Sequence, residues 1–375
     1  MNLGSGVGIG RVRGIEIRVH WSWFIILVLI TWSFADGLYR DLYEDWSGGQ
    51  RWTAAIVTSG LFFLSVLLHE LSHSFVAQRY GMTVPSITLF VFGGVSSIAG
   101  EMRNAKEEFA VAIAGPLMSW VLAAAFALLW LILRGSDVSG VVGYLAFING
   151  ALGLFNLLPG FPLDGGRVLR AIVWGRSKSI VQATKVAATV GSLIAYAMIG
   201  IGLVSVFYFG LFGAIWYVLI GLFLKSAAEG SYQAMLADRA LRNVETQAIM
   251  QPPTAPVDGS MSVQELVETR LLRRAERAYL VGDDGHVVGL VTATDITRLP
   301  RDQWARTAVE RVMVPSAKVH TVTPQTDLVD AMRLMQQHDV HQLPVLEDGR
   351  LVGMLTRGDV LRQVEIRMRF QDGNS

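Results

Sequence analysis

The strongest chemical signal in the sequence is the segment His69-Glu70-Leu71-Ser72-His73, which has the pattern HExxH. On a helix, two imidazoles four residues apart are separated by about 40° of rotation and 6 Å of rise, so both can bind one metal ion. Zinc suits such ligands. Glu70 lies about 100° around the helix from His69, so it is better placed to accept a proton from an attacking water than to bind the metal. The spacing therefore indicates metal-dependent hydrolysis.

The motif follows the apolar run SGLFFLSVLL, and ionisable residues within a membrane segment are costly and retained mainly for a function or a partner. A catalytic zinc usually has three protein ligands, and two residues compete to be the third. Asp164 follows two prolines in NLLPGFPLDGG, which break an apolar segment and free backbone groups that only a cavity could satisfy. The alternative for Asp164 is a turn or cap. His20 adjoins Trp21 and Trp23, which favours an interfacial position.

The composition predicts that a membrane domain positions these residues. Of 375 residues, 52% are hydrophobic and 17% are charged. About 25% of residues 245–375 are charged, as in soluble proteins, but only about 12% of residues 1–244. The absence of cysteine excludes a disulfide framework, a thiolate metal site and a cysteine nucleophile. The net charge of +1 gives no reason to expect nucleic acid as a partner.

Apolar segments near the ~20 residues that cross a bilayer predict about six transmembrane helices. The last two come from a stretch without charged residues that is too long for one crossing, and Tyr208-Phe209-Gly210 is the expected turn between them. The expected spans are residues 19–35, 52–76, 109–133, 141–158 and two within 186–224.

The positions of Lys and Arg predict the orientation of these spans. Basic residues precede the first span, separate the second from the third, and follow the fourth, so they all fall on one side: Arg11, Arg13, Arg18, Arg79, Arg103, Lys106, Arg167, Arg170, Arg176, Lys178 and Lys185. We therefore expect a multi-pass protein of the inner (cytoplasmic) membrane, with both termini in the cytoplasm.

Between the second and third spans, MTVPSITLFVFGGVSSIAG is too β-branched and too interrupted by Pro85, Gly93 and Gly94 to continue a helix. It predicts a strand, a turn and a second strand. Exposed strand edges are not tolerated in lipid, so such a sheet must be covered, interfacial or beside a wet cleft, where an edge could pair with an extended peptide. A simple interfacial loop is the alternative.

HExxH on the second span and N-x-x-P-x-x-P-L-D-G on the fourth resemble the site-2 protease family of intramembrane zinc metalloproteases. The resemblance implies that His69, His73 and Asp164 bind one zinc ion and that Glu70 is the general base and later proton donor. It implies that Asn156 holds the substrate carbonyl and its developing oxyanion; a hydrogen bond that completes the broken helix is the alternative. Two further segments match the family: the Phe92-Gly93-Gly94 region, as its substrate-contacting strand, and Gly115-Pro116, as its third-span pair.

The last third of the chain contains an internal repeat. The segment from Tyr279 to Asp295 aligns without gaps, at an offset of 64, with the segment from Leu343 to Asp359. Each copy predicts a strand, a D-G turn, a second strand and a Thr-x-x-Asp that opens a helix. The pattern resembles a tandem CBS pair, and such pairs commonly bind adenine nucleotides. The candidate nucleotide contacts, which are also good helix caps, are Thr292, Asp295, Thr356 and Asp359.

The sequence thus predicts a polytopic α-helical membrane domain of about six transmembrane helices, with a small membrane-associated β-hairpin or sheet, plus a soluble α/β tandem CBS module. The expected domains are 1–228 (protease), 229–256 (juxtamembrane helix and linker), 257–306 (first CBS repeat) and 307–375 (second repeat and tail).

The predicted function is intramembrane proteolysis of a single-span membrane protein, such as an anti-sigma factor or a signal-peptide remnant. The cytoplasmic CBS pair would regulate it, bind an adenine nucleotide or form a homodimer. The alternatives are a CBS-gated ion channel or transporter that uses the intramembrane His, Glu and Asp, and a catalytically silent member that only binds partners.

Overall fold

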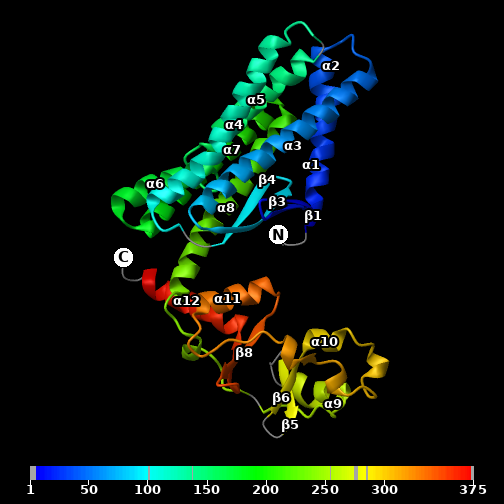
Figure 1. Ribbon diagram of the computed structural model, residues 1–375, viewed down its shortest axis with the longest axis vertical. Helices are drawn as coiled ribbons and strands as arrows, with labels where there is room; N and C mark the ends of the chain where they lie inside the picture. Colours follow the sequence, from blue (N-terminus) through cyan, green and yellow to red (C-terminus); the bar gives the residue numbers. More distant parts are fainter. Residues whose placement is uncertain are drawn as a thin grey trace. The chain divides into compact units, whose positions relative to one another are not determined.

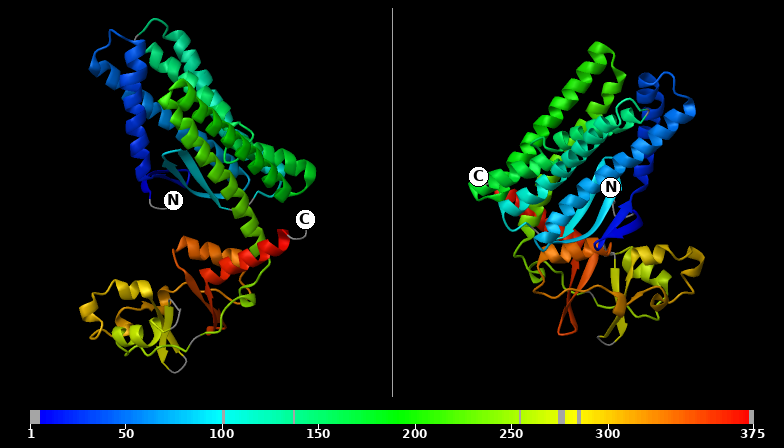
Figure 2. Two further views of the ribbon diagram at one scale, coloured as in Figure 1. Left: turned by 180° about the vertical axis from the view of Figure 1, so that it is seen from behind. Right: turned by 45° about the horizontal axis from the view of Figure 1, so that its top comes forward.

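The computed structural model describes residues 6–99, 102–136, 138–253, 255–273, 278–283 and 286–372. The chain forms two compact units, residues 1–233 and residues 234–375. Figure 1 shows the long helices of the first unit side by side, and Figure 2 shows the same bundle from two further directions.

In the described part of the chain, six helical segments are long and apolar enough to cross a membrane, which confirms the predicted number of spans. The first runs from Trp21 to Leu42 and consists of α1 (Trp21–Trp32), a π-helical turn (Ser33–Leu38) and α2 (Tyr39–Leu42). The others are α3 (Gly48–Arg79), α4 (Ala105–Ile132), α5 (Ser139–Asn156), α7 (Ile180–Phe209) and α8 (Ile215–Leu241), and a shorter helix, α6 (Asp164–Ser177), follows α5.

The boundaries of these helices follow local signals. α3 begins with a capping box in which Ser47 accepts from the backbone of Gln50 while the Gln50 side chain accepts from the backbone of Ser47. α7 ends at Gly210, whose φ of 65° is the left-handed conformation that glycine adopts most easily. α8 is longer than predicted, because the expected last span and the helix-forming residues that follow it form one continuous helix to Leu241. No proline interrupts this stretch.

A four-stranded sheet lies beside the helices in the order β1-β2-β3-β4. β3 (Thr83–Phe90) and β4 (Gly93–Ala99) form the predicted hairpin. The sequence analysis did not foresee β1 (Val7–Val12) and β2 (Ile15–Val19), although β2 pairs with β3 in parallel. The buried side of β2 consists of Ile15, Ile17 and Val19, an alternation typical of a strand with one covered face.

The second unit contains the two predicted repeat copies. The hairpin of β5 (Ala278–Asp283) and β6 (His286–Thr292) and that of β8 (Gln342–Glu347) and β9 (Arg350–Thr356) have boundaries that differ by the predicted offset of 64. The Asp284-Gly285 turn lies outside the described residues, whereas the equivalent Asp348 and Gly349 both have positive φ, as in a tight hairpin turn. The helices of this unit are α9 (Val263–Leu266), α10 (Ala293–Thr297), α11 (Leu328–Gln337) and α12 (Arg357–Asp372).

The two copies exchange segments. β7 (Val314–Pro315), which precedes the second copy, pairs with β6 of the first copy. Gln251, which precedes the first copy, pairs with Met354 in β9 of the second. Each copy has its own core, and a third apolar cluster joins Leu280 and Leu290 to Leu351 and Met354. The copies therefore form one module.

Candidate metal centre

The structure brings His69 and His73 of α3 together with Asp164, the first residue of α6. The Nε2 atoms of the two histidines are 3.2 Å apart, and they lie 3.0 and 3.2 Å from Oδ2 of Asp164. Tetrahedral zinc with ligands at 2.0–2.1 Å places ligand atoms about 3.3 Å from one another. Both histidines are buried, 4% exposed each. The three atoms thus have the spacing of three corners of a zinc site.

Hydrogen bonds from α4 orient both imidazole rings. Nδ1 of His73 lies 2.7 Å from the backbone carbonyl of Val111. Because a carbonyl only accepts, Nδ1 carries the proton and Nε2 keeps its lone pair for a metal. Nδ1 of His69 lies 2.9 Å from the hydroxyl of Ser119, which can accept in the same way. Three electron-pair donors then face one point, and a divalent cation satisfies that arrangement.

Gly115 of α4 lies directly against the two ligand histidines. A Cβ added to this residue would lie 2.1 Å from Nε2 of His73 and 2.5 Å from Nε2 of His69. No side chain fits at those distances. The Gly115-Pro116 pair, which the sequence linked to this family only by its pattern, therefore has a physical role at the ligands.

Glu70 is placed beside β4. Oγ of Ser96 in β4 donates to Oε2 of Glu70 at 2.8 Å, and the hydroxyl of Ser74 donates to Ser96 at 3.2 Å. Gly94 lies so close to this carboxylate that an added Cβ would be 2.4 Å from Cγ of Glu70. The hairpin thus fixes the carboxylate, and the sequence analysis had not identified Ser96.

A buried ion-pair cluster attaches α6 to α4. Glu108 of α4 is fully buried; its Oε1 accepts from Nε of Arg170 at 2.7 Å and lies 3.8 Å from Nε of Arg167. Burial lowers the pKa of Arg167, and the Glu108 carboxylate opposes that shift. Since Asp164 begins the helix that carries both arginines, this cluster sets the position of the third ligand.

The other candidate residues lie at different places. Asn156 is the last residue of α5 and is half-buried, and within the described residues its side chain makes no hydrogen bond, so the expected alternative of a helix-completing bond is not observed. Phe92 stacks on Phe223 of α8 with 4.1 Å between ring centroids, and Gly93 forms the turn with a φ of 128°. His20 is buried, and its side chain caps α1 by accepting from the backbone N–H of Ser22.

The second unit contains a cleft of about 1360 Å³ between the two repeat copies. The four residues predicted to contact nucleotide line it as two equivalent pairs: Thr292 donates to Asp295 at 2.6 Å, and Thr356 donates to Asp359 at 2.5 Å. Both pairs cap the following helices. The basic residues that line the cleft come from three separate segments of the chain, and two of them lie on α12: Arg298, Lys318, Arg357 and Arg362.

Comparison with known proteins gives matches over both units. Residues 57–138 and 132–199 match the model of peptidase family M50, and residues 246–302 and 309–366 match the CBS domain model. The Mycobacterium tuberculosis protein named "Putative zinc metalloprotease Rip3" is 34% identical over 96% of this chain and 93% of its own length. Zinc metalloprotease MJ0392 of Methanocaldococcus jannaschii is 30% identical over 95% of each chain. The solved site-2 protease from M. jannaschii covers 60% of this chain and 95% of its own, at 30% identity and a TM-score of 0.44.

The contact of Gly115 with the histidines leads to a first prediction. We expect Gly115→Ala to lower zinc affinity at least about tenfold, in the range seen when residues that support metal ligands are changed, because the added methyl displaces Nε2 of both histidines. Gly200→Ala in α7, where an added Cβ meets nothing within 4 Å, should keep full affinity. Zinc binding of the purified proteins against a competing chelator measures both. Equal affinity in the two variants would contradict the role of Gly115.

The buried carboxylate leads to a second prediction. We expect Glu108→Ala to destabilise the membrane unit by about 3–5 kcal/mol, because it leaves two partly buried arginines without their buried partner, and to lower zinc content, because α6 carries Asp164. Glu229→Ala removes an exposed pair with Lys225 and should cost less than about 1 kcal/mol. Thermal unfolding in detergent and zinc per protein test this. A Glu108→Ala protein as stable and as zinc-loaded as Glu229→Ala would refute it.

Proposed function

The chain belongs to peptidase family M50, the site-2 protease family, and is a multi-pass zinc metalloprotease with a CBS pair, and on that basis we propose that it hydrolyses a peptide bond within or near the transmembrane helix of a single-span membrane protein. The observation that carries the proposal is the convergence of His69 and His73, which lie in the membrane-crossing helix α3, with Asp164 at the start of α6. A centre in that position acts on a substrate in the same bilayer.

We further propose that the protein lies in the cytoplasmic membrane with both termini in the cytoplasm. The basic residues support this orientation, since those before the first span and on α6 fall on one side. His69 follows Trp52 by 17 residues in α3, or about 25 Å of helix. Because α3 runs toward the cytoplasmic side in this orientation, cleavage takes place in the inner half of the membrane.

The chemistry follows from the arrangement of the site residues. A zinc ion held by the three ligands supplies Lewis-acid chemistry, since it lowers the pKa of water and polarises a carbonyl group. Glu70 accepts a proton from the attacking water while the oxygen of that water bonds to the carbonyl carbon of the substrate. Glu70 then delivers that proton to the amide nitrogen as the C–N bond breaks, which yields a carboxylic acid and an amine. The Ser96 hydroxyl holds the Glu70 carboxylate toward this reaction.

The substrate must be extended at the cleavage point, because a helix shields its carbonyl groups through internal hydrogen bonds. Within the described residues β4 has a paired strand on one side only, and Gly94 and Ser96 of this strand contact Glu70. An unwound segment that pairs with β4 comes to lie beside the base. Asn156 has an uncommitted amide that can donate to the developing oxyanion.

A third prediction tests the general base. We expect Glu70→Gln to abolish cleavage of a detergent-solubilised single-span substrate, with a loss of at least about 10²–10⁴-fold, as for removal of a general base. Zinc content should stay at the wild-type level, because Glu70 is not one of the three converging residues. Gel analysis of the products and zinc quantification in both proteins give the answer. If wild type and variant both bind zinc but neither cleaves several substrates, the metal is structural or transported, and cation flux through proteoliposomes becomes the test of the transporter alternative.

For the second unit, we propose that the cleft binds an adenine nucleotide and so regulates the protease. Its volume of about 1360 Å³ leaves room for a nucleotide, and the basic side chains of Arg298, Lys318, Arg357 and Arg362 suit a phosphate group. The paired Thr and Asp residues of the two caps lie at the same cleft, where a carboxylate can accept from ribose hydroxyl groups.

A fourth prediction tests the cleft. We expect AMP or ATP to raise the melting temperature of the purified chain, and the double variant Lys318→Ala/Arg362→Ala to weaken binding about tenfold or more, because charge-assisted phosphate contacts are lost. Arg333→Ala serves as the control, since Arg333 pairs with Asp330 on α11 and does not line the cleft. Titration calorimetry measures affinity. Equal affinity of the double variant and the control would contradict the assignment of the phosphate to these side chains of the cleft.

A further inference from the structure

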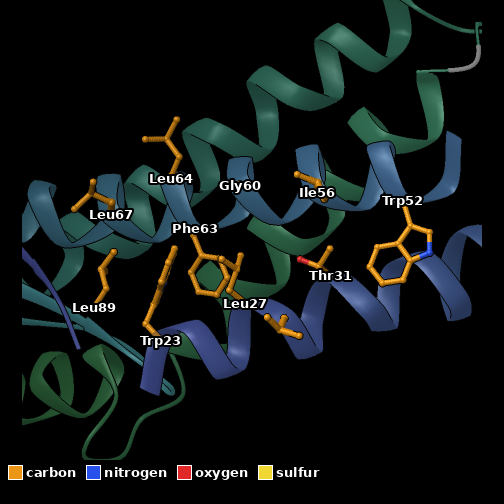
Figure 3. A pocket seen from close by; sticks show the side chains of 11 residues that line it. Trp23, Leu27, Thr31, Trp52, Ile56, Gly60, Phe63, Leu64, Leu67 and Leu89 are labelled. Carbon is orange, nitrogen blue, oxygen red and sulfur yellow. The ribbon is translucent and has the colours of Figure 1, made fainter. Parts of the chain in front are cut away.

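We propose that a groove between α1 and α3 receives the transmembrane helix of the substrate and directs it to Glu70. This proposal rests on the proposed protease function and adds the surface on which the substrate docks. The groove, called here the α1–α3 groove, has a volume of about 470 Å³, and its lining includes Trp23, Leu27 and Thr31 of α1 and Ile56, Gly60 and Phe63 of α3. Figure 3 shows the facing side chains of the two helices.

The shape of the groove suits a helix. Its lining residues follow a four-residue spacing on each side, at positions 23, 27 and 31 of α1 and at 52, 56, 60 and 64 of α3, as in the ridges by which helices pack. Gly60 interrupts the α3 ridge between Ile56 and Leu64. It is exposed, and an added Cβ would meet nothing within 4 Å. Small residues of this kind let a second helix approach closely in a membrane.

The length and character of the lining match a transmembrane segment. The lining on α3 runs from Trp52 to Leu67, 15 positions further along the helix, which is about 22 Å and most of the ~30 Å hydrocarbon thickness. The lining is apolar except for the indole N–H groups of Trp23 and Trp52 and the hydroxyl of Thr31, which is already bonded to Ser59 at 2.9 Å. An apolar helix is therefore a better occupant than a polar peptide.

Hydrogen bonds between the first span and α3 fix the relative position of the two walls of the groove. Besides the Thr31–Ser59 bond, the hydroxyl groups of Tyr39 and Thr58 lie 2.6 Å apart. All four residues are buried, and their hydrogen bonds join the first span to α3. The walls are thus fixed by their own contacts, and a substrate helix does not have to separate them.

The groove leads to the catalytic residues. Its last lining residues are Leu67 of α3 and Leu89 of β3. Leu67 lies one helical turn before Glu70, and Leu89 is paired with Gly94 in β4, the glycine in contact with the Glu70 side chain. A helix in the groove would therefore leave it near the base and next to the β3–β4 hairpin, whose free β4 edge is where we expect it to unwind. This continuity favours the substrate over a lipid or a second copy of the chain as the occupant.

The absence of cysteine makes a direct test possible. We would place one cysteine at Gly60→Cys and, as a matched control, at Gly200→Cys in α7, a second exposed glycine with nothing within 4 Å of an added Cβ. Each protein is mixed in lipid vesicles with a single-span substrate that carries one cysteine at successive positions, and disulfide formation is measured. We expect cross-links at Gly60→Cys that recur every three to four substrate positions, and few at Gly200→Cys.

A second experiment fills the α1–α3 groove with a larger side chain at position 60. Gly60→Leu should lower cleavage of the membrane-embedded substrate about tenfold, equivalent to about 1.4 kcal/mol of binding, mainly through KM, while zinc content stays unchanged. Gly200→Leu should cleave like the wild type. Cross-links that are absent at Gly60→Cys, or equal at both positions, would overturn the proposal, as would normal cleavage by Gly60→Leu, which indicates that only lipid occupies the groove. Failure of the wild type to cleave while Gly60→Cys still cross-links would contradict the protease function and leave the docking site standing.

Discussion

The structure of the membrane unit depends on one electrostatic constraint, the convergence of three electron-pair donors inside an apolar bundle. Two imidazole nitrogens and a carboxylate oxygen within 3.2 Å of one another repel unless a cation lies between them. Val111 and Ser119 of α4 hydrogen-bond to the Nδ1 atoms of the two ligand histidines. Gly115 of the same helix leaves room for their Nε2 atoms, which face the metal position. The same helix carries Glu108, which holds α6 and therefore Asp164. One helix without a ligand of its own thus organises the whole centre.

The HExxH residues and Asp164 could be predicted because each lies in a short segment whose residue types and spacing indicate metal binding. The residues that orient them could not, because each lies far away in sequence: Ser119 is 50 residues from His69, and Arg170 is 62 residues from Glu108. Such pairs depend on how helices pack, which a hydrophobic pattern does not specify. Gly115 shows the limit most clearly, since the pattern identified the residue and only the packing explains why it has no side chain.

The sheet gives a similar contrast. The β3–β4 hairpin was predicted from β-branched residues and its two glycines, whereas β1 and β2 were missed because glycines dominate the start of the chain. The alternation of Ile15, Ile17 and Val19 was visible, but the parallel partner of this strand lies about 70 residues away. In the second unit, the offset of 64 predicted both hairpins, whereas the basic residues of the cleft come from three separate segments that only the fold brings together.

The exchange of segments between the two repeat copies has a consequence for folding. Each hairpin is extended by a segment that precedes the other copy, through β7 on β6 and through Gln251 on Met354. Neither copy therefore has all of its own backbone hydrogen bonds when the other is unfolded, and an isolated half exposes a strand edge and the apolar surface of Leu280 and Leu290. The two copies should consequently unfold in one two-state transition, despite their separate cores. Anything that stabilises one half of the module therefore raises the stability of the whole.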